Sequence, residues 1–268
     1  MAKIPIYGYE FDEEAWRRRE GLEFALLDKV YSGADLSDLR VLDGDTGVGY
    51  SAKYLALRVK GGFVVTVDID PRAFEMLTNL MAGKSLNEYN IQFVRGDLRE
   101  LGFIRDGCFD VVNLHFTVHT VESTTPGGTL QVLEGAYRVL RPGGTLVITE
   151  NYPTFKPVDR AQELLIELSR IEEEIMEALG AARRDVEYEP DELAGMLVRV
   201  GFSEVSYTKI SDGEMDPTLL DWALYLIKRA HEIKGSKEGI VRRIEEKLNE
   251  ARIYGIRGSP SYAIYALK

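Results

Sequence analysis

The chain has 268 residues, of which 44 are acidic and 33 are basic, so its formal net charge at pH 7 is -11. This length suffices for one large hydrophobic core, and we expect one domain with insertions. The negative charge argues against a nucleic acid as the main partner, because binding to a phosphate backbone depends on cationic side chains.

The single cysteine, Cys108, excludes a disulfide framework and a metal site built from cysteines, and we predict no metal site. The sequence contains no run of about 18 apolar residues and begins without the pattern of a signal peptide. We therefore expect a cytoplasmic protein that does not enter a membrane. The share of charged residues, 29%, is compatible with a thermophilic source.

Short apolar runs alternate with helix-length amphipathic segments along the chain. This alternation is typical of a parallel sheet that is covered by helices on both faces. Each of the first five runs ends in or beside polar residues, and ligands bind at such strand ends in open parallel sheets. The predicted strands are, in chain order, residues 40–45, 62–70, 91–97, 108–116, 144–152, 202–210 and 261–268.

Two helical stretches exceed what this sheet needs. Residues 158–180 place apolar side chains along one stripe, and residues 217–254 predict two helices separated near "KGSK". Core packing is the ordinary role of such stripes. Because these stretches follow the fifth and sixth strands, a lid over the strand ends is the alternative role. The segment from Tyr152 through the helix at 158–180 and the helices around Trp222 and Tyr225 would then enclose the acceptor, with slower hydrogen exchange expected in residues 152–185.

The stretch "VLDGDTGVGYSA", residues 41–52, leads from a predicted strand through two glycines into a predicted helix. Such a loop lets the backbone approach a ligand closely. Gly47, Gly49 and Ala52 match the G-x-G-x-x-A pattern of dinucleotide-binding proteins. Asp43 argues against a dinucleotide, because a fixed carboxylate is a poor neighbour for a pyrophosphate and a good one for an ammonium or sulfonium group.

Seven segments, in the expected order, resemble motifs of the class I S-adenosylmethionine-dependent methyltransferases. The first, "VLDGDTGVG", resembles that family's glycine motif V-L-D-x-G-x-G-x-G. The others are "VVTVDIDP", "VRGDL", "FDVVNLHFTVHTV", "EGAYRVLRPGGTLVITE", "DELAGMLVRVGFSEVSY" and "YAIYALK". The resemblance spans most of residues 36–210 and the final strand.

This resemblance implies an α/β fold: a Rossmann-like, seven-stranded, mostly parallel sheet with an antiparallel last strand and helices on both faces. Helical insertions follow strands five and six. The implied single domain divides into an N-terminal helical cap at 1–35, a cofactor-binding core at 36–152, helical insertions at 153–188 and 212–258, and segments at 189–211 and 259–268 that complete the sheet.

The resemblance also implies S-adenosylmethionine as the cofactor. Asp68 would hold both ribose hydroxyls, Asp97 would accept from the adenine amino group, and Leu98 would pack near the ring. The chemistry agrees, because a cofactor without phosphate needs carboxylate acceptors. A solvated turn or a helix cap is the ordinary role of such acids, and Asp70 before Pro71 fits a cap. The predicted cofactor residues are Asp43, Asp45, Gly47, Gly49, Asp68, Ile69, Asp97, Leu98 and Asn113.

Asp45 departs from the family pattern, because it occupies the first glycine position of the motif. Aspartate tolerates the left-handed conformation better than most residues, but it brings bulk and charge. If its side chain crowds the loop, Asp45→Gly tightens cofactor binding. If it pairs with the ammonium group of the cofactor, which we favour, the same substitution weakens binding.

Methyl transfer is an in-line displacement, so holding the acceptor and excluding water can supply much of the catalysis. A general base is needed only if the acceptor must lose a proton. The candidate catalytic residues near the predicted methyl position are His115, His119, Glu150 and Tyr152. A supporting role is the alternative for the histidines, since His119 matches a family histidine that is often structural. The aromatic residues Tyr7, Tyr9, Phe11 and Trp16 either cover the substrate or pack the first helix onto the core.

We therefore predict a methyltransferase that acts on a small molecule or metabolite. A nicotinamide-dependent oxidoreductase and a non-catalytic cofactor-binding module remain alternatives, the second favoured by Asp45. A nucleic-acid methyltransferase is a further alternative, because "NLHF" at 113–116 faintly resembles the N-P-P-Y/F motif, although the prolines are missing. The acceptor and the oligomeric state cannot be derived from the sequence.

Overall fold

The computed structural model describes residues 3–6, 9–81, 85–180, 186–235 and 237–268. The chain forms two compact units. One comprises Glu23–Pro153, Asp185–Ile210 and Ser261–Lys268, and we call it the sheet unit. The other comprises Met1–Leu22, Thr154–Arg184 and Ser211–Pro260, and we call it the helical unit. The predicted insertions, 153–188 and 212–258, begin and end near these breaks.

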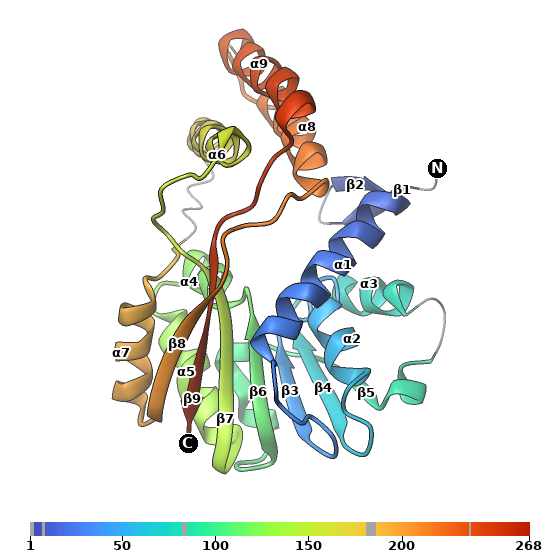
Figure 1. The fold of residues 1–268 in the computed structure, drawn as a ribbon, viewed down its shortest axis with the longest axis vertical. Helices are drawn as coiled ribbons and strands as arrows, with labels where there is room; N and C mark the ends of the chain where they lie inside the picture. The colour runs from blue at the N-terminus through green and yellow to red at the C-terminus, as the bar shows by residue number, and fades with distance from the viewer. Residues whose placement is uncertain (1–2, 7–8, 82–84, 181–185, 236) are drawn as a thin grey trace. The chain divides into compact units, whose positions relative to one another are not determined.

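The sheet unit contains a seven-stranded sheet with the order β5-β4-β3-β6-β7-β9-β8 (Figure 1). β3 pairs in parallel with β4 and β6, and β9 pairs antiparallel with β7. The fold class predicted from the sequence is therefore confirmed. The strands are β3 (Arg40–Gly44), β4 (Phe63–Asp68), β5 (Ile91–Arg95), β6 (Phe109–His115), β7 (Leu140–Asn151), β8 (Ser203–Ser211) and β9 (Ser261–Leu267).

Helices cover both faces of this sheet, which explains why its strands are continuous apolar runs. Buried side chains of α1, α2 and α3 form one core with Val111 and Val147, and those of α5 and α7 form another with Val112 and Leu146. The elements are α1 (Glu13–Val30), α2 (Tyr50–Ala56), α3 (Arg72–Leu80), α4 (Val118–Thr124), α5 (Gly128–Val139) and α7 (Pro190–Val200), with the short 3-10 helices η1 (Leu86–Tyr89) and η2 (Leu98–Phe103).

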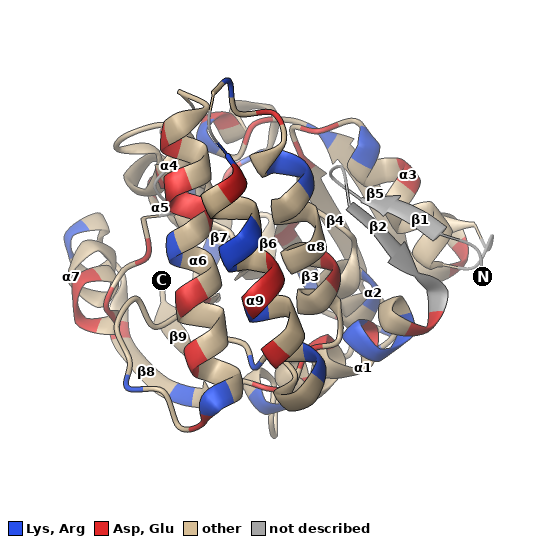
Figure 2. Ribbon diagram, turned by 90° about the horizontal axis from the view of Figure 1, so that it is seen from above, with Lys and Arg blue, Asp and Glu red and all other residues tan. Residues whose placement is uncertain are grey.

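The helical unit is built around α6 (Arg160–Ala178), α8 (Thr218–Ala230) and α9 (Glu238–Tyr254). The stripe predicted on 158–180 packs into the core of this unit, where Leu164 and Leu168 are fully buried together with Ile244. Acidic and basic residues are interleaved along α6 and α9 (Figure 2). These helices therefore use their apolar faces for packing and their charged faces for solvent and ion pairs.

The N-terminal segment differs from the predicted helical cap at 1–35. A two-stranded antiparallel sheet of β1 (Lys3–Ile6) and β2 (Tyr9–Asp12) precedes α1, with Ile4 opposite Phe11. The reason is the spacing of the apolar residues, which alternate with a period of two before Glu13 and favour strands over a helix. Of the four N-terminal aromatic residues, Trp16 is buried and Tyr7 lies outside the described residues.

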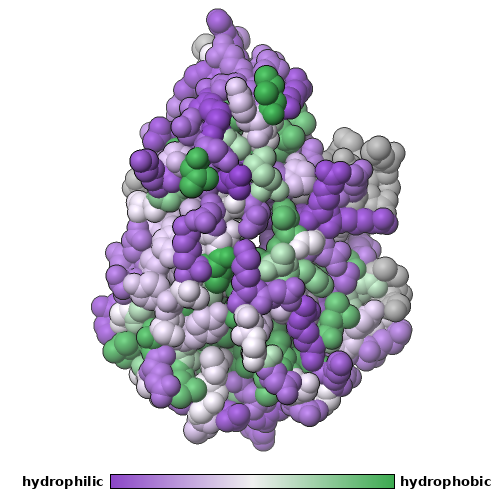
Figure 3. Space-filling view, in the orientation of Figure 1, coloured by the Kyte–Doolittle hydropathy of each residue, from purple (hydrophilic) through white to green (hydrophobic). Residues whose placement is uncertain are grey.

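Most of the molecular face in Figure 3 is hydrophilic, and its hydrophobic side chains form separate small groups. Single exposed apolar residues of this kind are normal for a protein surface. Among the described residues, no helix has the length and apolar character required to cross a membrane.

Candidate functional site

The loop after β3 is held against β4 and the core by its backbone. The amides of Asp45 and Thr46 both donate to the carbonyl of Val67, at 2.9 and 3.2 Å. Asp45 adopts the left-handed conformation with φ of 64°, as the motif requires at its first glycine position. At Gly49, where φ is 99°, a Cβ atom would lie 2.7 Å from a side-chain carbon of Leu77. The loop thus approaches the core more closely than a side chain would allow.

Asp43 is buried beneath this loop and accepts three side-chain hydrogen bonds. The donors are Asn113 Nδ2 at 2.7 Å, Ser51 Oγ at 3.0 Å and Thr66 Oγ1 at 3.1 Å. Burial raises the pKa of Asp43 to about 6, against the lowering effect of these donors. Asn113 in turn accepts a hydrogen bond from the Tyr31 hydroxyl at 2.8 Å. Both predicted cofactor residues, Asp43 and Asn113, therefore belong to a network that braces the loop.

Asp68 ends β4 and receives backbone amides from two directions. Gly47 donates to Oδ2 at 2.8 Å, and Asp70 donates to Oδ1 at 2.7 Å. Asp45 also hydrogen-bonds to Asp68 through its side chain, and burial together with the Asp68 charge raises the pKa of Asp45 to about 7. Burial raises the pKa of Asp68 as well. Burial and the neighbouring Asp68 charge therefore favour the protonated form of Asp45.

Asp97 lies at the end of the neighbouring strand and begins η2. Its carboxylate accepts the backbone amide of Arg99 and the Arg99 Nε, both at 2.9 Å, and this pairing lowers the pKa of Asp97. Leu98 is buried, whereas Ile69 is exposed. Because β4 and β5 are adjacent, Asp68 and Asp97 stand at neighbouring strand ends, as the sequence predicts.

This arrangement fits S-adenosylmethionine. The cofactor presents ribose hydroxyls and an adenine amino group, which are donors suited to carboxylates, and a cationic sulfur, which suits an acidic edge. The tight backbone around Gly49 provides the close approach that such a ligand needs. Among the described residues, no group of three acidic, histidine or cysteine side chains could hold a metal ion.

Glu150 on β7 and His119 on α4 form a pair in which all hydrogen-bonding side-chain atoms have partners. Glu150 is buried and accepts the Val118 amide at 2.8 Å and His119 Nδ1 at 2.7 Å. The other ring nitrogen of His119 lies 3.2 Å from the Thr120 hydroxyl. Glu150 thus satisfies the first turn of α4 and fixes the His119 ring.

Tyr152, the fourth catalytic candidate, packs edge to face against Tyr262, with ring centroids 5.0 Å apart. Burial raises the pKa of its hydroxyl. A phenol that is harder to ionise is less suited to act as a base, so its position favours a packing role.

His115 forms a second pair with a residue that the sequence reasoning missed. Its Nε2 lies 2.8 Å from the Glu23 carboxylate of α1, and only 7% and 6% of the two side chains are exposed. His115 Nδ1 is buried without a hydrogen bond. Glu23 shares one helical stripe with the buried residues Leu27 and Val30, and an acid in such a stripe is the signal that could have revealed it.

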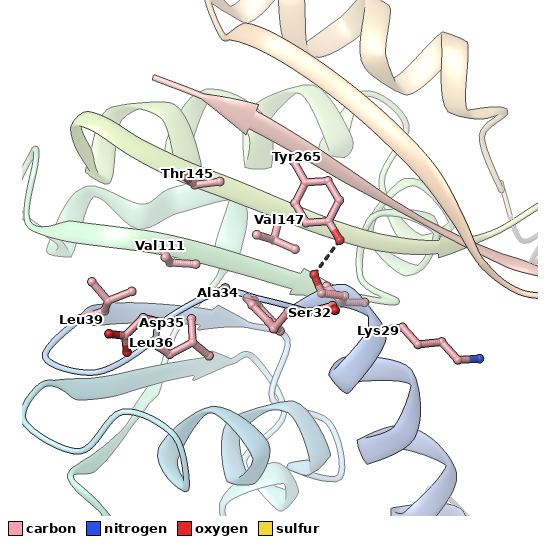
Figure 4. Close-up of a pocket in the computed structure, with 12 residues that line it drawn as sticks. Lys29, Ser32, Ala34, Asp35, Leu36, Leu39, Val111, Thr145, Val147 and Tyr265 are labelled. Atoms are coloured by element: carbon pink, nitrogen blue, oxygen red, sulfur yellow. Dashed lines mark hydrogen bonds between the residues drawn. The ribbon is translucent and has the colours of Figure 1, made fainter.

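A separate cavity of about 460 Å³ lies between the end of α1 and one face of β6, β7 and β9 (Figure 4). Val111, Val147 and Leu36 give it apolar walls, and the Tyr265 hydroxyl donates to the Val30 carbonyl at 2.6 Å. None of the predicted site residues lines it, so this cavity is distinct from the strand-end site.

Comparison with known proteins agrees with this geometry. Residues 42–148 match the family model described as a methyltransferase domain. The ubiquinone/menaquinone biosynthesis C-methyltransferase UbiE of Proteus mirabilis is 29% identical over 183 residues, which cover 65% of this chain and 70% of that protein. The corresponding protein of Pectobacterium atrosepticum is 28% identical over 186 residues, with the same coverage.

Solved structures share the fold. A SAM dependent methyltransferase from Archaeoglobus fulgidus superposes with a TM-score of 0.58 at 21% identity, covering 96% of this chain and 97% of its own. Phosphoethanolamine N-methyltransferase 2 of Haemonchus contortus, solved with S-adenosyl-L-methionine, has a TM-score of 0.55 at 16% identity, covering 92% of this chain and 52% of its own. The family match and the relatives support a class I S-adenosylmethionine-dependent methyltransferase, and the solved structures share its fold.

Proposed function

We propose that the protein transfers the methyl group of S-adenosylmethionine to a carbon atom of a small-molecule acceptor. The observation that carries this proposal is the match over 65% of the chain to relatives named as C-methyltransferases of ubiquinone and menaquinone biosynthesis. The net charge of -11 supports a small acceptor over a nucleic acid. With S-adenosylmethionine as the cofactor, the glycine loop has no need to accommodate the pyrophosphate of a nicotinamide dinucleotide.

The strand-end residues hold the cofactor in this proposal. S-adenosylmethionine, when bound, supplies an electrophilic methyl group on a cationic sulfur. Asp68 accepts from the ribose hydroxyls and Asp97 from the adenine amino group, while Asp43 and Asn113 keep the glycine loop in place. The chain then contributes by holding the acceptor in line with the methyl group and by excluding water.

Acceptor selection is assigned to the segments inserted after the fifth and sixth strands. All the predicted cofactor residues belong to the sheet unit, which leaves the helical unit free to vary with the substrate. Hydrogen exchange in residues 154–180 should slow when cofactor and acceptor are both bound, with a smaller effect from the cofactor alone. Protection of residues 9–20 with no change in 154–180 would assign selection to the N-terminal segment.

The test of the proposed function uses S-adenosylmethionine with a radiolabelled methyl group. The purified protein is incubated with 1,4-dihydroxynaphthalene, with phosphoethanolamine and with transfer RNA, and the methylated atom is identified by mass spectrometry. Label on a ring carbon of the naphthalene supports the proposal. Label on the nucleic acid alone, or calorimetric binding of NADH without binding of S-adenosylhomocysteine, would overturn it.

A further inference from the structure

Two unsatisfied polar atoms lie side by side in the sheet unit. His115 on β6 is paired in register with Thr149 on β7, so the two side chains are neighbours on one face of the sheet. His115 Nδ1 and Thr149 Oγ1 are both buried and have no hydrogen-bond partner in the described structure. Thr149 is fully buried.

Buried polar atoms without partners are rare, because each forfeits its hydrogen bonds to water. Two such atoms on adjacent strand ends are more costly than one, and an apolar pair would pack there without that cost. Polar atoms at such a position are explained if a ligand group supplies the missing hydrogen bonds. The backbone of Phe116, next to His115, also supports a ligand at this position. Phe116 has a φ of 54°, which is strained for a bulky side chain, and such strain concentrates at functional sites.

Glu23 determines which nitrogen of His115 is available. A carboxylate accepts hydrogen bonds, so Nε2 carries the proton that it donates to Glu23 over 2.8 Å. Nδ1 is then the unprotonated nitrogen with a free electron pair. A histidine oriented in this way by an acid is the arrangement found where the second nitrogen acts as a base.

We propose that His115 is the general base that removes a proton from the acceptor, with Glu23 as its positioning residue and Thr149 as a hydrogen-bond partner of the acceptor. This inference rests on the proposed function. Nδ1 takes the hydroxyl proton of the acceptor, and the electron pair left on oxygen shifts so that the adjacent carbon forms the bond to the methyl carbon. The hydrogen on that carbon then returns to the oxygen, which restores the hydroxyl group. The carbon–sulfur bond breaks with its pair going to sulfur, which leaves neutral S-adenosylhomocysteine, and the proton on His115 then passes to solvent.

The step also defines the class of acceptor. A base is useful only when the acceptor loses a proton, as a phenol, an enol or an aromatic carbon next to a hydroxyl group does. A tertiary amine or a thioether needs no such base. Protonated amines and thiols also lose a proton, but the proposed function places the methyl group on carbon. The acceptor is therefore a hydroxylated aromatic or enolic molecule, in which the hydroxyl group meets Nδ1 and the Thr149 hydroxyl.

The experiment compares His115→Gln, Glu23→Gln and Thr149→Val with the wild-type chain. His231→Gln, an exposed position at the end of α8, is the matched control. Three quantities are measured: the affinity for S-adenosylhomocysteine, the kcat and KM for 1,4-dihydroxynaphthalene, and the imidazole tautomers by ¹⁵N NMR. We expect His115→Gln to lower kcat about 100-fold or more and Glu23→Gln about 10-fold. Cofactor affinity stays within about twofold in both, as expected for groups that act on the acceptor.

The tautomer measurement distinguishes positioning from simple support. In the wild-type chain His115 should carry its proton on Nε2, and Glu23→Gln should abolish this preference. Failure of the wild-type chain to bind S-adenosylhomocysteine would overturn the proposed function itself. Normal binding with an unchanged kcat in His115→Gln would overturn this inference alone. If the naphthalene is not methylated, the ¹⁵N NMR measurement of the His115 tautomer tests the inference. A proton on Nδ1 of His115 would then overturn it.

Discussion

Two histidine–glutamate pairs lie at neighbouring strand ends, and they differ in whether every ring nitrogen has a hydrogen-bond partner. In the His119–Glu150 pair, both carboxylate oxygens and both ring nitrogens have neighbours within hydrogen-bond distance. In the His115–Glu23 pair, one ring nitrogen is buried and unpartnered. The same residue types therefore form a fully hydrogen-bonded pair in one place and a pair with one unpartnered ring nitrogen in the other.

On our proposal for His115, the unsatisfied hydrogen-bonding atom, and not the residue type, distinguishes a catalytic histidine from a supporting one. The two buried acids beside the glycine loop are both hydrogen-bonded. Asp43 accepts three side-chain hydrogen bonds, and Asp68 accepts the backbone amides of Gly47 and Asp70, so Asp68 can hold the loop as well as a ligand. Four measurements would break or sharpen this distinction.

The largest effect is expected for Glu150→Ala. The substitution leaves the Val118 amide and His119 without their acceptor in a buried place, and we expect the free energy of unfolding to fall by about 3 kcal/mol. Urea denaturation measures this loss. Glu246→Ala, on an exposed ion pair of α9, is the control and should change little. If Glu150→Ala kept its stability and lost methyl transfer instead, the His119–Glu150 pair would be the catalytic one.

Asp68→Ala should act on the cofactor, and it also removes the acceptor of the Gly47 and Asp70 amides. We expect it to weaken binding of S-adenosylhomocysteine by about 1–3 kcal/mol, the usual loss for charge-assisted hydrogen bonds. Titration calorimetry measures the affinity, and Asp43→Asn serves for comparison. A larger loss of stability than of affinity in Asp68→Ala would show that Asp68 mainly holds the loop.

Asp45→Asn should remove a pH dependence. Because the folded pKa of Asp45 is raised to about 7, folding retains a proton, and this contribution to stability is lost as the pH rises from about 4 through 7. Asparagine cannot ionise, so the variant should be more stable than the wild-type chain at about pH 8 and equal to it at about pH 4. Parallel urea titrations that coincide at both pH values would show that Asp45 does not hold the proton.

The smallest effect is expected for Arg99→Ala. Arg99 hydrogen-bonds to the carboxylate of Asp97, which we propose as the acceptor for the adenine amino group. Removing the Arg99 side chain frees this carboxylate to accept from the cofactor. The pair is partly exposed, and we expect S-adenosylhomocysteine to bind more tightly by less than about 1 kcal/mol. Weaker binding in the calorimeter would indicate that Arg99 itself contacts the cofactor.

The sheet and the glycine loop could be predicted because local patterns encode them. Buried parallel strands are continuous apolar runs, and the acids at their ends follow the glycine loop at sequence spacings that match the family motifs. The Glu23–His115 contact could not be predicted in this way, because 92 positions separate its members and only the packing of α1 brings them together. Motif reasoning proposed both His119 and His115 as catalytic candidates, since a motif records where a histidine occurs and not which of its nitrogens is used.

The place of β9 in the sheet has a consequence for folding. It follows β7 and β8 in the sequence, yet it lies between them in the sheet, and Tyr262, Ala263 and Ile264 are fully buried. Until these residues leave the ribosome, β7 presents an open edge with unpaired amides and carbonyls to other chains. The sheet can be completed only after synthesis of more than a hundred residues beyond β7, which makes β9 insertion a late, non-local step. Substitutions that weaken β9 should therefore appear first as aggregation of newly made protein, before any defect in the purified enzyme.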